Sequence, residues 1–97
     1  MLIAKKHDLG TKSILAVCDK EHLGKSFEEG NLFFEVKEKF YGKEKITEKQ
    51  LIELIKEADS INFFGNKCTK IAIKEGLISE GNVIIIAGVK HAQAYTL

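Results

Sequence analysis

Two short segments of the sequence hold residue types that bind anions or exchange protons. The candidate site residues are Gly65, Asn66, Lys67, Gly88, Lys90, His91 and Gln93. A helix that begins near Asn66 would present free N–H groups and a positive dipole end to a phosphate or carboxylate. His91 could act as a general acid or base near neutral pH, and the Gln93 amide could orient a substrate carbonyl or hydroxyl. His91 and Gln93 are therefore the catalytic candidates, and the others are ligand-binding candidates.

The same residues are also consistent with a purely structural role. Gly65 and Gly88 can be turn residues, and His91 can be exposed or can cap a neighbouring group. Because spacing alone does not decide between the two interpretations, the sequence leaves open whether the protein is an enzyme.

Two further motifs fall short of a complete site. Gly24-Lys25-Ser26 resembles the end of a phosphate-binding loop, but Asp19 stands where that loop requires its first glycine. Cys18 and His22 have a spacing that metal ligands use, yet no second pair follows them. We therefore predict no metal and no cofactor.

The cysteines and one aromatic pair each allow a functional and a structural interpretation. Cys18 could be a nucleophile near His22, but it lies in the most apolar stretch of the chain, where a buried thiol is favoured. Cys68 lies beside the apolar stripe of a predicted helix and is also expected in the core. Phe40-Tyr41 could stack on a nucleobase, although aromatic pairs at strand ends more often close a core.

The elements that would position these residues alternate in type along the chain. Strands are expected at residues 2–6, 13–18, 32–36, 61–64 and 83–87, helices at about 47–59 and 66–75, and loops at 25–29 and 43–45. This order, β-β-β-α-β-α-β, predicts an α+β fold with a mixed sheet and a C-terminal βαβ unit.

Capping signals mark the ends of both helices. Thr47-Glu48-Lys49-Gln50 is a capping box, and Ile46 can pack on Leu51 across it. Asn66 is the expected N-cap of the second helix, and Gly76 fits the left-handed position after its last turn.

The apolar strands determine where a ligand would bind. Residues 14–18 and 83–87 are apolar on both faces, which predicts strands that are covered on both sides. If strands 61–64 and 83–87 are parallel neighbours, Gly65 and Gly88 lie at the same carboxyl edge, where open α/β sheets bind ligands. The candidate site depends on this pairing.

Composition limits the class of protein. With 97 residues, of which 44% are hydrophobic and 30% charged, the chain is expected to form one domain over residues 1–97. No apolar run is long enough for a membrane span or a signal peptide, and the cysteines lack CxxC partners, so we expect a cytoplasmic protein with free thiols. All 15 basic residues are lysines, and 14 acids leave a net charge of +1, which predicts no strong overall field.

The chain resembles a small, mainly archaeal family called domain of unknown function 424. The segments that carry the resemblance are 16–19, 23–25, Phe40-Tyr41-Gly42, Glu57-Ala58-Asp59, Gly65 and 88–93. The family favours proline between the valine and the histidine of the last segment, where this chain has Lys90. The resemblance implies an archaeal cytoplasmic source and a shared α+β fold, and it implies no established activity.

Two functional hypotheses follow. The first is a noncatalytic binding module for RNA or a component of the translation apparatus, with phosphate contacts from Lys67 and Lys90. The second is a small-molecule enzyme or sensor for a phosphate- or carboxylate-bearing ligand, in which His91 is the acid or base and Asn66 helps to hold the anion. A homodimer formed through an exposed sheet edge is a further possibility.

Overall fold

Residues 1–95 are described by the computed structural model, and they form two sheets and a small set of helices. The strands are β1 (Leu2–Asp8), β2 (Ser13–Asp19), β3 (Ser26–Glu29), β4 (Leu32–Glu35), β5 (Lys45–Ile46), β6 (Ser60–Phe64), β7 (Ile84–Ile86) and β8 (Val89–Tyr95). The α-helices are α1 (Glu38–Tyr41), α2 (Glu48–Ile55) and α3 (Asn66–Lys74), and the 3₁₀ turns are η1 (Lys20–His22) and η2 (Glu80–Asn82). The predicted α+β class is confirmed.

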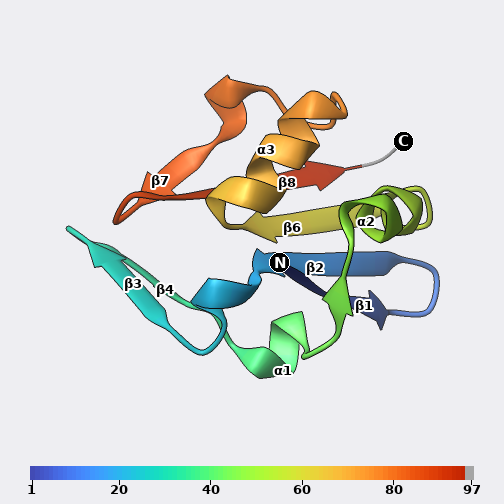
Figure 1. Cartoon of the computed structure of the whole chain (residues 1–97), viewed down its shortest axis with the longest axis horizontal. Coiled ribbons are helices and arrows are strands. Elements are labelled where there is room, and N and C mark those ends of the chain that lie inside the picture. The colour runs from blue at the N-terminus through green and yellow to red at the C-terminus, as the bar shows by residue number, and fades with distance from the viewer. Residues whose placement is uncertain (96–97) are drawn as a thin grey trace.

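The larger sheet has six strands in the order β5-β1-β2-β6-β8-β7 (Figure 1). β2 and β6 are parallel, with Cys18 opposite Phe64, whereas the other neighbouring pairs are antiparallel. β2 lies between β1 and β6, and its last five residues are all buried, as its apolar sequence predicts. The prediction of a mixed sheet whose second strand is covered on both faces is confirmed.

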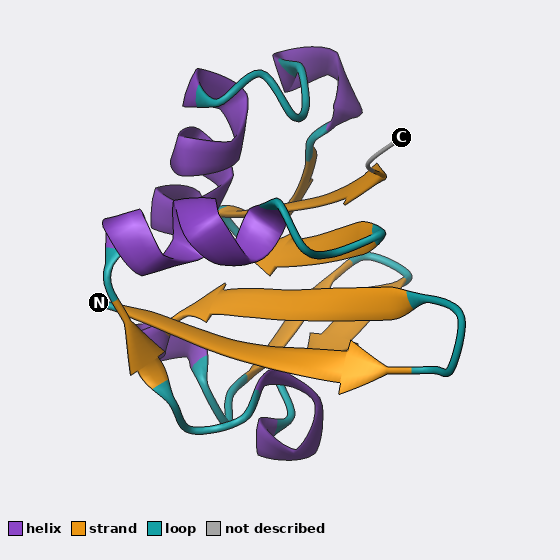
Figure 2. Cartoon of the chain, turned by 90° about the vertical axis from the view of Figure 1, so that its right-hand side faces the viewer, coloured by secondary structure: helices purple, strands orange, loops and turns teal. Residues whose placement is uncertain are grey.

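Different elements cover the two faces of this sheet. α2 and α3 lie over one face (Figure 2), where Leu51 and Ala72 join a core with Val17 and Phe63. α1 and the hairpin of β3 and β4 lie on the opposite face, where Tyr41, Phe34 and Phe64 belong to a second cluster. The two clusters therefore sandwich the sheet and bury the side chains of its central strands on both sides.

The predicted N-terminal cap of α2 and the predicted C-terminal cap of α3 are present. The Thr47 side chain accepts from the Gln50 backbone N–H at 3.1 Å, and the Gln50 side chain accepts from the Thr47 N–H at 2.8 Å. At the end of α3, the N–H of Leu77 donates to Ala72 O and that of Gly76 donates to Ile73 O, both at 3.0 Å. This is the Schellman pattern that Gly76 predicts. α2 ends at Ile55, a few residues earlier than expected.

The middle of the chain differs from the prediction. Residues 25–29 were expected to form a loop, but Ser26–Glu29 is a strand that pairs with β4 in a separate sheet. This hairpin forms because Phe27 and Phe34 pair across it and pack against the second cluster. Phe40 and Tyr41 were expected at a strand end and instead lie in the short helix α1.

The C-terminal βαβ unit has the predicted element order and strand direction, but its two strands, β6 and β7, are not neighbours. β8 lies between β6 and β7 and is antiparallel to both. Ala87 and Gly88, with φ of 49° and 81°, make a two-residue turn that folds β8 back beside β7. β7 is consequently an edge strand, and Ile84 and Ile85 are each 53% exposed, so the predicted burial on both faces was wrong.

Among residues 1–95, no helix combines the length and the apolar composition that crossing a membrane requires.

Candidate functional site

The start of α3 is held by a carboxylate from the protein itself. Asp19, the last residue of β2, accepts hydrogen bonds from the backbone N–H groups of Lys67 and Cys68, both at 2.9 Å. Asp19 is 3% exposed. Because β2 is the parallel neighbour of β6, its carboxyl end lies beside the helix that follows β6. The N–H groups that were expected to bind a phosphate therefore already have an internal anion as partner.

Asn66 is not the N-cap that the sequence predicts. Gly65 occupies that position, and Asn66 is the first residue of α3. The Asn66 side chain accepts from the Lys90 N–H at 2.8 Å and donates to Gly88 O at 3.4 Å. The structure thus brings Gly65, Asn66, Lys67, Gly88 and Lys90 to one edge, where Asn66 ties the turn before β8 to α3.

His91 and Gln93 lie on the opposite face of the sheet from α3. The His91 ring packs against Phe34 and Phe64, with ring centroids 4.9 and 5.7 Å apart, and its Nδ1 lies 2.9 Å from Phe63 O. Gln93 is exposed on the same side of β8, two residues further on. The proposed juxtaposition of His91 with Asn66 is therefore not formed, because residues 89–95 form a strand with alternating faces and not a loop.

Burial of His91 makes stability depend on pH. Desolvation lowers the pKa of His91 below its ordinary value, although the contact with Phe63 O partly opposes this. As the pH falls below about 6.5, the unfolded chain binds this proton first, so acidification destabilises the fold until the folded-state pKa is passed. We expect the urea midpoint of the wild type to fall more between pH 7.5 and 5.5 than that of His91→Gln. Equal losses in the two proteins would contradict this assignment.

The two cysteines belong to the core, as predicted. Both are free and buried. Desolvation and the nearby Asp19 raise the pKa of Cys18 to about 12, and the same causes raise the pKa of Cys68 well above its ordinary value. A thiol must ionise to attack an electrophile, so neither cysteine is suited to nucleophilic catalysis at neutral pH.

Ligand atoms of Asp19, Glu21 and His22 lie within 4.8 Å of one another, which sequence reasoning did not foresee. Both oxygens of Asp19 already accept backbone hydrogen bonds, and the His22 ring makes edge contacts with Phe27 and Phe64. We interpret the Asp19 carboxylate of this cluster as the structural junction between β2 and α3.

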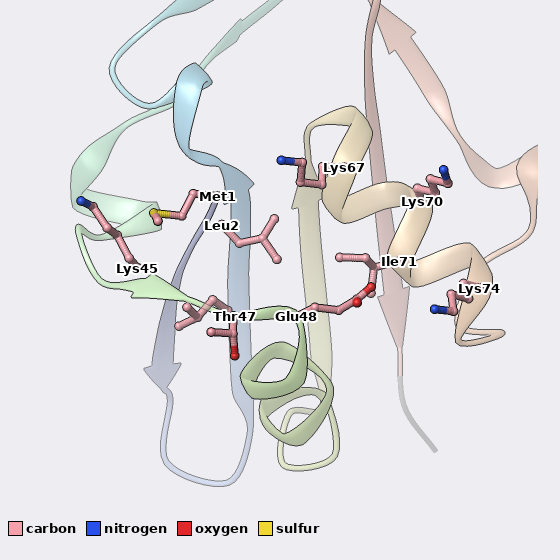
Figure 3. A pocket seen from close by; sticks show the side chains of 10 residues that line it. Met1, Leu2, Lys45, Thr47, Glu48, Lys67, Lys70, Ile71 and Lys74 are labelled. Atoms are coloured by element: carbon pink, nitrogen blue, oxygen red, sulfur yellow. The ribbon is translucent and has the colours of Figure 1, made fainter.

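A separate pocket of about 600 Å³ gathers lysine side chains beside α3. Lys67, Lys70 and Lys74 line it from the helix and Lys45 lines it from β5 (Figure 3). Its apolar lining comes from Met1, Leu2, Ile46 and Ile71, and Glu48 is the acidic residue among the described ones that line it. We call this feature the lysine pocket.

The charges around the lysine pocket are close enough to affect one another. The nearby Lys67 ammonium lowers the pKa of the Met1 amino group, and the nearby Lys45 ammonium lowers the pKa of Lys20. Within residues 1–95, no ammonium group that lines the pocket makes a salt bridge within 4.0 Å. The pocket is therefore a local concentration of positive charge on a chain whose net charge is only +1.

Sequence reasoning found only Lys67 among these lysines. Lys67, Lys70 and Lys74 are spaced by three and four residues, which places them on one side of a helix, and this signal was present in the sequence. Lys45 was expected in a loop, and no local pattern links it to α3. The predicted partner Lys90 lines a different pocket with Ile73, Glu80, Val83 and Ile85.

The fold and the lysine pocket together define a small α+β domain with a cationic pocket beside its longest helix. The chain belongs to a family of proteins of unknown function, DUF424, whose profile matches residues 7–97. It is similar to the crystal structure of an uncharacterized conserved protein from Methanopyrus kandleri, with 25% sequence identity and a TM-score of 0.81 over 99% of this chain and 91% of that one. No curated protein matches it significantly. The family resemblance of the sequence is thereby confirmed.

Proposed function

We propose that the protein is a noncatalytic binding module that holds RNA by its phosphates, with the lysine pocket as the contact surface. The observation that carries this proposal is the clustering of Lys45, Lys67, Lys70 and Lys74 around one pocket without a salt bridge to a described residue. Lysine ammonium groups neutralise phosphates and release counterions, which supplies most of the sequence-independent affinity for nucleic acids.

The arrangement of the lysines favours a polyanion over a single phosphate. Lys67 and Lys74 are seven residues apart on α3, so their Cα atoms are separated by about 10 Å along the helix axis. That separation exceeds the reach of one phosphate group and suits successive phosphates of a strand. Among residues 1–95, no histidine or cysteine lines the pocket, so it offers neither an imidazole nor a thiol.

The test is binding of labelled tRNA and single-stranded RNA across a range of salt concentrations. Wild-type affinity should fall steeply as salt rises. The triple substitution Lys67→Gln, Lys70→Gln, Lys74→Gln should weaken binding about 10- to 100-fold at about 50 mM salt and reduce the salt slope on single strands by about 2. Fluorescence anisotropy measures both quantities.

A matched variant separates this pocket from net charge. Lys12, Lys25 and Lys39 are exposed and lie outside the lysine pocket. Changing all three to Gln also lowers the formal net charge from +1 to −2. This control should bind RNA within about threefold of the wild type if local clustering matters. Equal weakening in the two variants, or no wild-type binding at about 50 mM salt, removes the proposal.

A further inference from the structure

The sheet face opposite α3 is covered at only one end of β6 and β8. Phe34 of the hairpin stacks on Phe64 of β6, with centroids 4.4 Å apart and planes 8° apart. At the other end of the same strands the face carries Asn62 beside Gln93 and Ser60 beside Tyr95, each pair in register between β6 and β8. Tyr95 is 73% exposed. This end of the face is therefore open where the first end is covered.

A pocket of about 290 Å³ lies at this open end. Its lining includes Phe40, Asn62, Gln93 and Tyr95, together with Ile14 and Ser60, and none of the described residues that line it is acidic or basic. The volume lies just below the usual range for small-molecule sites, roughly 300–1,000 Å³. It therefore suits one neutral ring system better than a long or charged ligand.

Two aromatic rings border the pocket. Phe40 is held in place by His7, whose ring stacks on it at 5.0 Å and 18°, and by Tyr41, which meets it edge-on at 5.0 Å. Tyr95 contributes a ring that is largely open to solvent. A fixed ring and an accessible ring are the surfaces on which a planar heterocycle stacks.

The amides of Asn62 and Gln93 supply hydrogen-bonding groups beside these rings. Tyr41 donates its hydroxyl proton to Asn62 Oδ1 at 2.9 Å, which leaves the Nδ2 protons of Asn62 as donors. Within the described chain, Asn62 Nδ2 makes no hydrogen bond. Every buried side-chain nitrogen and oxygen of the described residues has a partner, so Nδ2 is not buried and is accessible to solvent. The exposed Gln93 amide offers both a donor and an acceptor.

We propose that this pocket binds a nucleobase, which stacks on Tyr95 and Phe40 and presents its hydrogen-bonding edge to Asn62 and Gln93. Base edges carry donors and acceptors side by side, and asparagine and glutamine amides complement them. The base could belong to a free nucleoside or to an unpaired nucleotide of RNA. The site is on the opposite face from the lysine pocket and does not depend on it.

Titrations with nucleosides test this site without involving phosphate. Adenosine, guanosine, cytidine and uridine are added to the ¹⁵N-labelled full chain, and a single-stranded RNA of about ten nucleotides is added in parallel. We expect the side-chain amide signals of Asn62 and Gln93 to shift. Shifts with nucleosides identify the base alone as sufficient, and shifts only with the oligonucleotide identify RNA as its source. No shift with either probe overturns the proposal.

Variants of the two exposed residues provide the second measurement. Tyr95→Ala should weaken binding about tenfold because it removes the stacking surface, whereas Tyr95→Phe should stay within about threefold of the wild type. Gln93→Ala should weaken binding about fivefold. Tyr95→Ala that binds as tightly as the wild type would overturn the assignment. The lysine-pocket triple variant should bind nucleosides normally, so failure of the RNA proposal and failure of this one are distinguishable.

Discussion

Gly65→Ala is expected to lower the free energy of unfolding by about 4 kcal/mol. Gly65 has φ 136° and ψ 150°, a backbone region that is essentially restricted to glycine. A Cβ at this position would also collide with the carboxylate of Asp19. That carboxylate cannot move aside without releasing the N–H groups of Lys67 and Cys68. Urea denaturation followed by circular dichroism measures the loss.

Gly76→Ala is the matched control. Gly76 also has positive φ, at 76°, but a Cβ there meets no heavy atom of residues 1–95 within 4 Å. Its substitution adds backbone strain without a collision and should cost about 1 kcal/mol. If the two substitutions destabilise the protein equally, the close approach of Asp19 to Gly65 is not what requires glycine at position 65.

Asp19→Ala is expected to lower the free energy of unfolding by about 3 kcal/mol. It leaves the N–H groups of Lys67 and Cys68 without their acceptor, and Cys68 is fully buried. An N–H group that loses its partner away from water costs more than an exposed cap does. Amide hydrogen exchange should show that the first turn of α3 loses protection before the rest of the helix.

Two further variants determine how Asp19 acts. Asp19→Asn keeps one acceptor oxygen and should cost about half as much as Asp19→Ala. The double variant Asp19→Ala, Gly65→Ala should be less destabilised than the sum of its parts, because removal of the carboxylate removes the collision. Strict additivity would show that the two residues act independently.

The same junction links stability to the proposed RNA contact. Asp19 holds the first turn of α3, and the next turns carry Lys67, Lys70 and Lys74 along the lysine pocket. Loss of the Asp19 contacts should therefore disturb the positions of Lys67, Lys70 and Lys74 as well as the fold. The lysine-to-glutamine variants change charge at the surface, whereas the Asp19 and Gly65 variants destabilise the fold. Comparing RNA binding by these two sets of variants separates altered binding from altered folding.

The local elements of this protein could be predicted from its sequence to a large extent. The capping box at Thr47 and Gln50, the left-handed Gly76 and the fully apolar residues 14–18 were identified correctly, because each depends on neighbours within a few residues. The order of the main elements and the α+β class followed from them. The sequence spacing of Lys67, Lys70 and Lys74 also indicated that they share one side of α3.

The tertiary structure alone decided which strands became neighbours, and the candidate site depended on that choice. The sequence shows that residues 84–86 are apolar, but it does not show which strand lies beside them. In the structure, a tight turn at Ala87 and Gly88 brings β8 back between β6 and β7. This return makes residues 89–95 a strand with alternating faces, and so it places His91 away from Asn66. Asp19 accepts a hydrogen bond from Lys67, which lies 48 positions away in the sequence. This contact also depends on strand pairing, which joins residues that no local pattern relates.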